Sequence, residues 1–238
     1  MPGRFAPKIL FCLQPVVKVI AMNFEQARFN MVEQQIRPWK VLDTEVLAVL
    51  GSVPRELFTP EQYQFMAYVD EEIPLPGGHV MLPPRIDARL MHDLELKGTE
   101  SVLEIGTGSG YRTALLARRA REVLSLEIDP AQAEAARRHL QAAGIHNARV
   151  VQGDGAQAPV QGAPFDAIVL GGSVAEVPQG LLDQLKVGGR LIAVVGTDPV
   201  MQATLFTRTG ERQFSSTVLW DTSVPALQNF ARPARFKF

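Results

Sequence analysis

Three glycines spaced two residues apart follow a short apolar run in the stretch VLEIGTGSGY, residues 102–111. Glycine permits a sharp turn and lets the backbone come close to a ligand. Between a strand and a helix, such a turn typically receives a phosphate or a nucleotide. A P-loop is excluded, because no Gly-Lys-Ser/Thr follows. The spacing therefore predicts a nucleotide-type cofactor, and other residues must decide which one.

Three acids narrow the choice of cofactor. Glu127 ends an apolar run and is placed to bind ribose hydroxyls, and Asp154 is placed to accept a hydrogen bond from an adenine amino group. A dinucleotide site uses GxGxxG, whereas Tyr111 stands where that fingerprint needs its last glycine. Glu104, at the end of the first strand, also disfavours a dinucleotide. These features favour S-adenosylmethionine, and a nicotinamide dinucleotide is the distant alternative.

The predicted cofactor site therefore combines the glycine loop with residues of the next two strands. Its members are Glu104, Gly106, Thr107, Gly108, Ser109, Gly110, Tyr111, Glu127, Asp154 and Gly155. No metal is predicted, because the single cysteine, Cys12, excludes a multi-cysteine centre and the four histidines show neither HExxH nor HxxxH spacing.

Alternating apolar runs and helical periods after residue 98 predict the scaffold for this loop. The strand-like runs are SVLEI, EVLSLEI, ARVVQ, FDAIVL and RLIAVV, and helical segments such as YRTALLARRA and PAQAEAARRHLQAAG lie between them. This alternation predicts a doubly wound α/β fold with a mostly parallel sheet. Near the end, MQATLFTRTGERQFSSTVLWD predicts an antiparallel hairpin joined at Thr209-Gly210.

The first part of the chain has a helical pattern interrupted by a proline-rich loop. The predicted helices are 24–36, ended by Pro38, 44–52, capped by Asp43, and 88–96, stopping at Gly98. Residues 70–84, DEEIPLPGGHVMLPP, predict a loop or an irregular hairpin.

Length and composition set the domain organisation and the compartment. The chain has 238 residues, a net charge of −1 and no charge-free apolar run long enough to span a membrane, so neither a nucleic-acid nor a membrane partner is expected. We expect residues 1–21 to be a disordered or non-native upstream extension, because Met22 directly precedes the first helical pattern. We expect residues 22–97 to form a helical segment with the proline-rich loop, residues 98–238 to form the cofactor-binding domain, and the two to make one compact unit. Cytoplasm is the expected compartment, and the sequence does not predict the oligomeric state.

The order and spacing of several blocks resemble the protein-L-isoaspartate O-methyltransferases. These blocks are MVEQQI, VPREL-F, IPLP, VLEIGTGSGY, GDG, FDAIVL and LKVGGRLIAVVG, between about Phe29 and Gly196. The resemblance implies a Rossmann-like methyltransferase fold with a seven-stranded, mostly parallel sheet, an antiparallel last strand and N-terminal helices. It also implies that S-adenosylmethionine is the cofactor and that the enzyme methylates an isoaspartyl carboxylate of damaged protein, which initiates repair. A carboxylate is ionised at neutral pH, so this chemistry requires no general base and no catalytic residue is assigned.

The proline-rich loop departs from the family pattern. The family typically has Gly-Gln-Thr-Ile-Ser-x-Pro, whose hydroxyls help to hold the isoaspartyl carboxylate, whereas this chain has GHVMLPP at residues 78–84. His79, Val80 and Leu82 are therefore the candidate acceptor-loop residues, and Arg37 or Arg85 are candidates to supply charge. The C-terminus, VPALQNFARPARFKF, also departs from the Phe-Val-Pro-Leu-like ending of the family.

Three functions follow from these residues. The first is an isoaspartyl carboxyl methyltransferase acting on a protein or peptide. The second is a methyltransferase of the same fold whose altered loop takes a different, more apolar and unidentified small acceptor. The third is a binding protein for S-adenosylmethionine that has lost methyl transfer.

Overall fold

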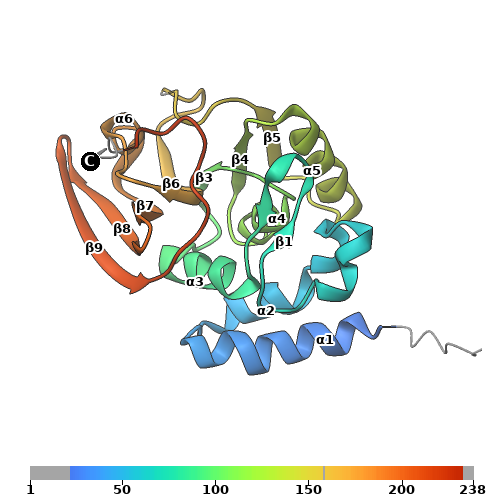
Figure 1. Ribbon diagram of the computed structural model, residues 1–238. Coiled ribbons are helices and arrows are strands. Elements are labelled where there is room, and N and C mark those ends of the chain that lie inside the picture. The colour runs from blue at the N-terminus through green and yellow to red at the C-terminus, as the bar shows by residue number, and fades with distance from the viewer. Residues whose placement is uncertain (1–21, 158, 233–238) are drawn as a thin grey trace, which may run out of the picture.

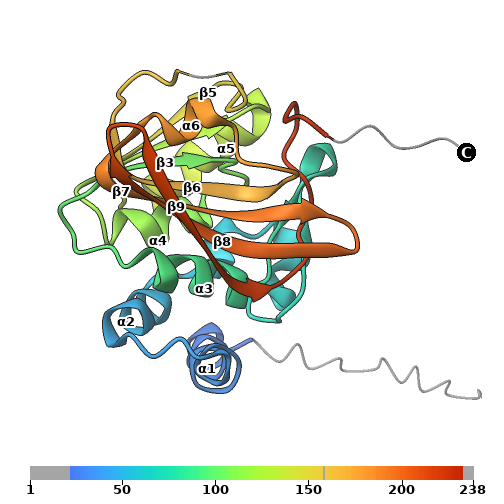
Figure 2. The ribbon, with the colours of Figure 1, turned by 90° about the vertical axis from the view of Figure 1, so that its left-hand side faces the viewer.

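The structure, a computed structural model, describes residues 22–157 and 159–232. Its centre is a seven-stranded sheet in the order β5-β4-β3-β6-β7-β8-β9 (Figures 1 and 2). The strands are β3 (Ser101–Ile105), β4 (Glu122–Glu127), β5 (Ala148–Gln152), β6 (Phe165–Val174), β7 (Leu185–Thr197), β8 (Val200–Gly210) and β9 (Gln213–Asp221). The pairs from β5 to β7 are parallel. The predicted mostly parallel sheet is confirmed.

The hairpin β8–β9 closes the sheet with antiparallel pairing, and β8 is the strand that runs against the others. The predicted junction at Thr209-Gly210 is wrong by two residues. Gly210 still pairs with Gln213, so the turn consists of Glu211 and Arg212. A Thr-Gly pair is a common turn signal, but here the pairing of β8 with β9 continues through it.

Helices cover the sheet and place the glycine loop. The elements are α3 (Pro84–Leu94), α4 (Tyr111–Ala117), α5 (Pro130–Ala142) and α6 (Gln179–Leu182). Helix α5 begins as its sequence indicates, with Pro130 in the first turn and the Asp129 carboxylate accepting from the N–H groups of Ala131 and Gln132. The predicted start and stop of α3 were wrong. The helix begins at Pro84, where a proline loses no hydrogen bond, and ends before Glu95, which has φ of 51°, rather than at Gly98.

The N-terminal helices lie at the periphery, and both views show α1 beside α2 and outside the sheet. Helix α1 (Phe24–Asn30) continues as a π-helical segment, Met31–Ile36, and then as a 3-10 turn, Arg37–Trp39. Pro38 therefore does not end the helix at once, because it occupies the first turn of the 3-10 segment. Helix α2 (Thr44–Ser52) is capped by Asp43, as predicted.

The proline-rich loop is an irregular hairpin, as predicted, formed by β1 (Ile73–Pro74) and β2 (Val80–Met81). One hydrophobic core joins residues of the helical segment, such as Met31 and Phe58, to residues of the sheet, such as Val102 and Ile192. This shared core supports the proposal that residues 22–97 and 98–238 form one compact unit. The expected extension, residues 1–21, lies outside the described residues. Over the ranges that the structure describes, no helix combines the length and the hydrophobicity needed to cross a membrane.

Candidate functional site

The glycine loop connects β3 to α4 at the carboxyl end of β3. Gly106, Gly108 and Gly110 have φ of +89°, +55° and +89°, a region that side chains with a Cβ rarely adopt. The N–H of Gly106 donates to the carbonyl oxygen of Leu126 at 2.9 Å, so the loop is fastened to the neighbouring strand β4. The predicted turn is present, and glycine is required by its backbone.

Glu127 stands at the end of β4 and faces the loop. Its carboxylate is almost fully buried and accepts from the N–H of Gly108 at 2.8 Å and from the N–H of Asp129 at 3.1 Å. Each carboxylate oxygen accepts one of these hydrogen bonds, so each retains a free lone pair. Because Glu127 also lines a cavity of about 200 Å³, it presents two acceptors to that cavity, as a ribose diol requires.

Asp154 and Gly155 follow β5 and line the same cavity. Asp154 Oδ1 accepts from the N–H of Ala156 at 3.0 Å, and its Oδ2 accepts from Asn229 Nδ2 at 2.9 Å. A methyl group at Gly155 would lie 2.2 Å from Ile105 Cγ2, so the chain can pass so close to β3 only as glycine. The structure therefore brings the glycine loop, Glu127, Asp154 and Gly155 together around one cavity.

The acceptor loop and the C-terminal segment also line this cavity. Gly78, His79, Val80 and Leu82 line it, as do residues 225–228. The C-terminal segment runs along the end of β6, where the N–H of Ser173 donates to Pro225 O and the N–H of Leu227 donates to Ser173 O, both at 2.9 Å.

Gly171 and Leu227 also line the cavity, although neither was predicted as a site residue. A methyl group at Gly171 would lie 2.4 Å from the carbonyl oxygen of Gly106, so β6 can approach the glycine loop only with glycine there. The pair Gly171-Gly172 at the end of an apolar run was a signal available in the sequence. No sequence pattern marks Leu227 as a site residue, because only the path of the folded chain after β9 brings it to the cavity.

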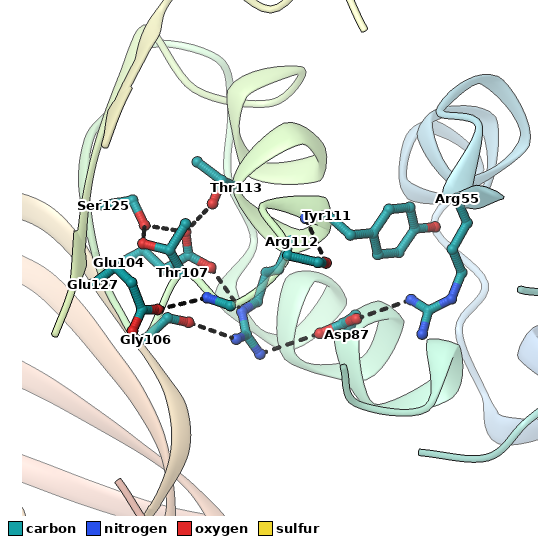
Figure 3. A network of polar contacts seen from close by, with 12 residues as sticks. Arg55, Asp87, Glu104, Gly106, Thr107, Tyr111, Arg112, Thr113, Ser125 and Glu127 are labelled. Atoms are coloured by element: carbon teal, nitrogen blue, oxygen red, sulfur yellow. Dashed lines mark hydrogen bonds and ion pairs between the residues drawn. The ribbon is translucent and has the colours of Figure 1, made fainter. Parts of the chain in front are cut away.

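Glu104 lies beneath the loop rather than in the cavity. It is fully buried, and its Oε1 accepts from Arg112 Nε at 3.0 Å while its Oε2 accepts from Thr113 Oγ1 at 2.5 Å and Ser125 Oγ at 2.7 Å (Figure 3). Thr107 joins this group through its contact with Ser125 Oγ. Burial raises the pKa of Glu104, although Arg112 and the two hydroxyls act in the opposite direction. These contacts make Glu104 a support for the loop, and direct contact with a cofactor stays a prediction.

The buried network extends from Glu104 toward the helical segment (Figure 3). Arg112 Nη1 donates to Asp87 Oδ1 at 3.1 Å, and Arg55 Nη1 donates to Asp87 Oδ2 at 3.3 Å. Burial alone would lower the pKa of Arg112, but Asp87 and Glu104 outweigh it and raise that pKa. Desolvation raises the pKa of Asp87, against the effect of both arginines. Neither Arg112 nor Asp87 was predicted as a site residue.

Ser109, Gly110 and Tyr111 complete the predicted loop set. The hydroxyl oxygen of Ser109 accepts from the N–H of Tyr111 at 3.4 Å, and Gly110 passes close to Ala136 of α5. The Tyr111 ring points away from the loop, with the Arg55 guanidinium 4.5 Å from its centroid (Figure 3). Burial raises the pKa of Tyr111 to about 12. Its contacts join α4 to the helical segment.

The candidate charges of the acceptor loop lie in different places. His79 lines the cavity, with its Nε2 3.5 Å from Asp129 Oδ2, which holds the loop against the start of α5. Arg37 pairs with Glu33 on its own helix, and Arg85 pairs with Asp70 and lies over the Trp39 ring. Neither arginine lines this cavity, so the structure does not bring their charges to the part of the acceptor loop that lines it.

A larger cavity, about 710 Å³, adjoins the first across the C-terminal segment. Pro225, Ala226 and Leu227 line both cavities. Ser173, Ala175 and Thr197 are among the residues that line the larger one only. Within residues 22–157 and 159–232, no cluster of histidine, cysteine or acidic side chains is suited to hold a metal ion.

Comparisons with known proteins agree on one family. The family model described as Protein-L-isoaspartate(D-aspartate) O-methyltransferase (PCMT) matches residues 26–228. Protein-L-isoaspartate O-methyltransferase 1 of Rhodopseudomonas palustris is 44% identical over 188 residues, which cover 79% of this chain and 77% of the relative. The enzyme of Brucella anthropi is 38% identical over 213 residues, which cover 89% and 98%.

Solved structures show the same fold. A protein-L-isoaspartate O-methyltransferase superposes with a TM-score of 0.74 at 26% identity and covers 86% of this chain and 66% of its own. A second structure, described as a putative enzyme of this kind from Plasmodium falciparum in complex with S-adenosyl-L-homocysteine, gives a TM-score of 0.72 at 20% identity over 87% and 99%.

Proposed function

Because the chain belongs to the protein-L-isoaspartate(D-aspartate) O-methyltransferase family, we propose that it transfers a methyl group from S-adenosylmethionine to the free carboxylate of an isoaspartyl residue. One observation carries this proposal for the chain itself. The glycine loop, Glu127 and the acceptor loop line a single crevice. The residues proposed for cofactor and acceptor therefore meet in one place, as group transfer between two bound molecules requires.

The cavity residues fit the adenosine part of S-adenosylmethionine. The free lone pairs of Glu127 suit the two ribose hydroxyls, and Asp154 offers an acceptor to the adenine amino group. Gly155 and Gly171 let their segments pass close to Ile105 and to the glycine loop, where a methyl group would clash. The cofactor supplies a methyl group on a sulfonium, which is already activated for transfer.

The residues of the chain then have to hold and orient the acceptor. A carboxylate acceptor is ionised at neutral pH, so no side chain has to remove a proton. We propose that the peptide on either side of the isoaspartate lies in the cavity of about 710 Å³, which shares a wall with the cofactor cavity. Val80, Leu82 and Leu227 would exclude water from the acceptor carboxylate. A charged carboxylate that has lost part of its hydration shell is less stable, which favours its conversion to the uncharged methyl ester.

The apolar side chains of Val80 and Leu82 also support a second candidate, a more apolar acceptor for the same transfer. Transfer of labelled methyl to an isoaspartyl peptide, with the matching aspartyl peptide as control, separates the candidates. Base-labile label on the isoaspartyl peptide alone supports the first function. If the protein binds S-adenosylhomocysteine but labels neither peptide, the isoaspartyl assignment is wrong and a different acceptor or a purely binding role follows.

We further propose that the protein acts in the cytoplasm. Its single cysteine leaves it without an intramolecular disulfide, which is typical of proteins from reducing compartments. Fractionation of the native cells with an antibody against the chain tests this, and recovery outside the cytoplasmic fraction would contradict it.

A further inference from the structure

A second, smaller cavity lies where the acceptor loop meets the glycine loop. Its volume is about 40 Å³, and Val80, Leu82, Gly106, Gly108 and Gly171 line both this cavity and the cofactor cavity. The two cavities are therefore parts of one crevice. Neither Glu127 nor Asp154 lines the smaller one, so it lies at the end of the crevice away from the adenosine-binding residues.

Arg112 is, among the described residues, the one cationic side chain that lines this smaller cavity. Its Nε donates to Glu104 and its Nη1 donates to Asp87, at 3.0 and 3.1 Å, whereas its Nη2 reaches the carbonyl oxygen of Gly106 only at 3.4 Å. A guanidinium has five N–H donors. These three contacts leave one N–H on each terminal nitrogen, and two such donors can form a bidentate fork.

Two features leave donors of Arg112 available to a further group, beyond its pairing with Glu104 and Asp87. Glu104 already accepts from the hydroxyls of Thr113 and Ser125, and Asp87 already pairs with Arg55 (Figure 3). In addition, the backbone leaves space for the guanidinium at the crevice, since a methyl group at Gly171 would lie 2.5 Å from Arg112 Nη2. A buried arginine edge beside a cavity is suited to a planar anion.

We propose that Arg112 binds a carboxylate group of the substrates in this cavity, with Asp87 and Glu104 holding its guanidinium in place. The inference rests on the proposed function, which supplies two such groups. One is the α-carboxylate of S-adenosylmethionine, and the other is the acceptor carboxylate of the isoaspartyl residue. Both would be recognised by the same fork, and the experiment has to separate them.

The test is Arg112→Lys, which keeps a cation for Asp87 and Glu104 but removes the fork. Calorimetry measures the Kd of S-adenosylhomocysteine and of 5′-methylthioadenosine, which lacks the amino-acid group, and kinetics measure the KM of an isoaspartyl peptide. If Arg112 binds the cofactor carboxylate, we expect the Kd of S-adenosylhomocysteine to rise about tenfold or more while that of 5′-methylthioadenosine is unchanged. If it binds the acceptor, we expect the KM of the peptide to rise by a similar factor while both Kd values are unchanged.

Thr113→Val is the matched control, because Thr113 belongs to the same network and is fully buried but does not line the cavity. It reports what general weakening of the network does to binding. Should Arg112→Lys not fold, the double variant Glu104→Gln with Arg112→Gln removes one charge of each sign and leaves the pair of Arg55 and Asp87 intact.

Two results would overturn the proposal. One is an Arg112 variant in which neither Kd nor KM changes relative to wild type. The other is a uniform loss of affinity for both nucleosides and the peptide that Thr113→Val reproduces, since that pattern means support of the fold only. Failure of the proposed function gives a different result, because the wild-type protein itself would bind no S-adenosylhomocysteine. The proposed carboxylate site would then be wrong as well.

Discussion

The guanidinium of Arg55 donates to the carbonyl oxygen of Leu82 at 2.5 Å, so a residue of the N-terminal helical segment holds the acceptor loop by its backbone. Arg55 is fully buried and also pairs with Asp87, whose other oxygen accepts from Arg112. A continuous chain of polar contacts therefore runs from the acceptor loop to the support of the glycine loop. The two walls of the crevice share this buried connection.

Arg55→Met should destabilise the protein strongly, because it leaves Leu82 O and part of Asp87 buried without their partner. We expect a loss of roughly 3–5 kcal/mol in the free energy of unfolding, measured with a chemical denaturant. Arg37→Met is the matched control, since Arg37 pairs with Glu33 on an exposed helix face and should matter by less than about 0.5 kcal/mol. Equal effects of the two substitutions would contradict the assigned importance of the buried network.

Glu127→Gln should weaken cofactor binding while the fold persists. The amide keeps the shape of the side chain but loses one acceptor and the negative charge, so Gly108 and Asp129 no longer share a carboxylate. We expect the Kd of S-adenosylhomocysteine to rise roughly tenfold to a hundredfold by calorimetry. Glu134→Gln, on the exposed face of α5, should leave that Kd unchanged, and an unchanged Kd for Glu127→Gln would remove Glu127 from the site.

Gly171→Ala should distort the glycine loop, because the added methyl group would lie 2.4 Å from the carbonyl oxygen of Gly106. We expect a loss of about 1–3 kcal/mol in stability, typical of overpacking, together with weaker binding of S-adenosylhomocysteine. Gly51→Ala in α2 is the control, since its methyl group would have no atom within 4 Å. It should stabilise the protein by about 0.5–1 kcal/mol and leave binding unchanged. Normal affinity in Gly171→Ala would argue against the close approach of β6.

Ala175→Trp should fill part of the larger cavity without touching the cofactor cavity. We expect the KM of an isoaspartyl peptide to rise several-fold, while the Kd of S-adenosylhomocysteine is unchanged. Ala142→Trp, at an exposed position near the end of α5, controls for the presence of an added indole. If the peptide KM does not change, the peptide does not occupy this cavity.

The features that the sequence predicted well depend on local physics. The positive φ of Gly106, Gly108 and Gly110, the cap of Asp43 and the first-turn position of Pro130 all follow from conformational preferences of single residues. Alternating strand and helix patterns likewise predict the sheet. Glu127 and Asp154 were predicted to lie together because strand ends in a parallel sheet meet at one edge, and both line one cavity.

The features that the sequence did not predict depend on packing between distant segments. Arg112 and Asp87 are of charged residue types that usually lie at the surface. Only the packing of α3 against α4 buries them together. Leu227 reaches the cavity because the chain after β9 returns along β6. The cofactor role of Glu104 stays a prediction, whereas its place in the buried network depends on partners from α4 and β4, Arg112 and Ser125.

The most direct measurement is a crystal structure of the protein with S-adenosylhomocysteine. We predict adenine beside Asp154, the ribose hydroxyls on Glu127 and the sulfur end of the ligand facing Val80 and Leu82 of the acceptor loop. Ligand bound outside the crevice, or bound with its sulfur turned away from that loop, would mean that cofactor and acceptor do not meet there.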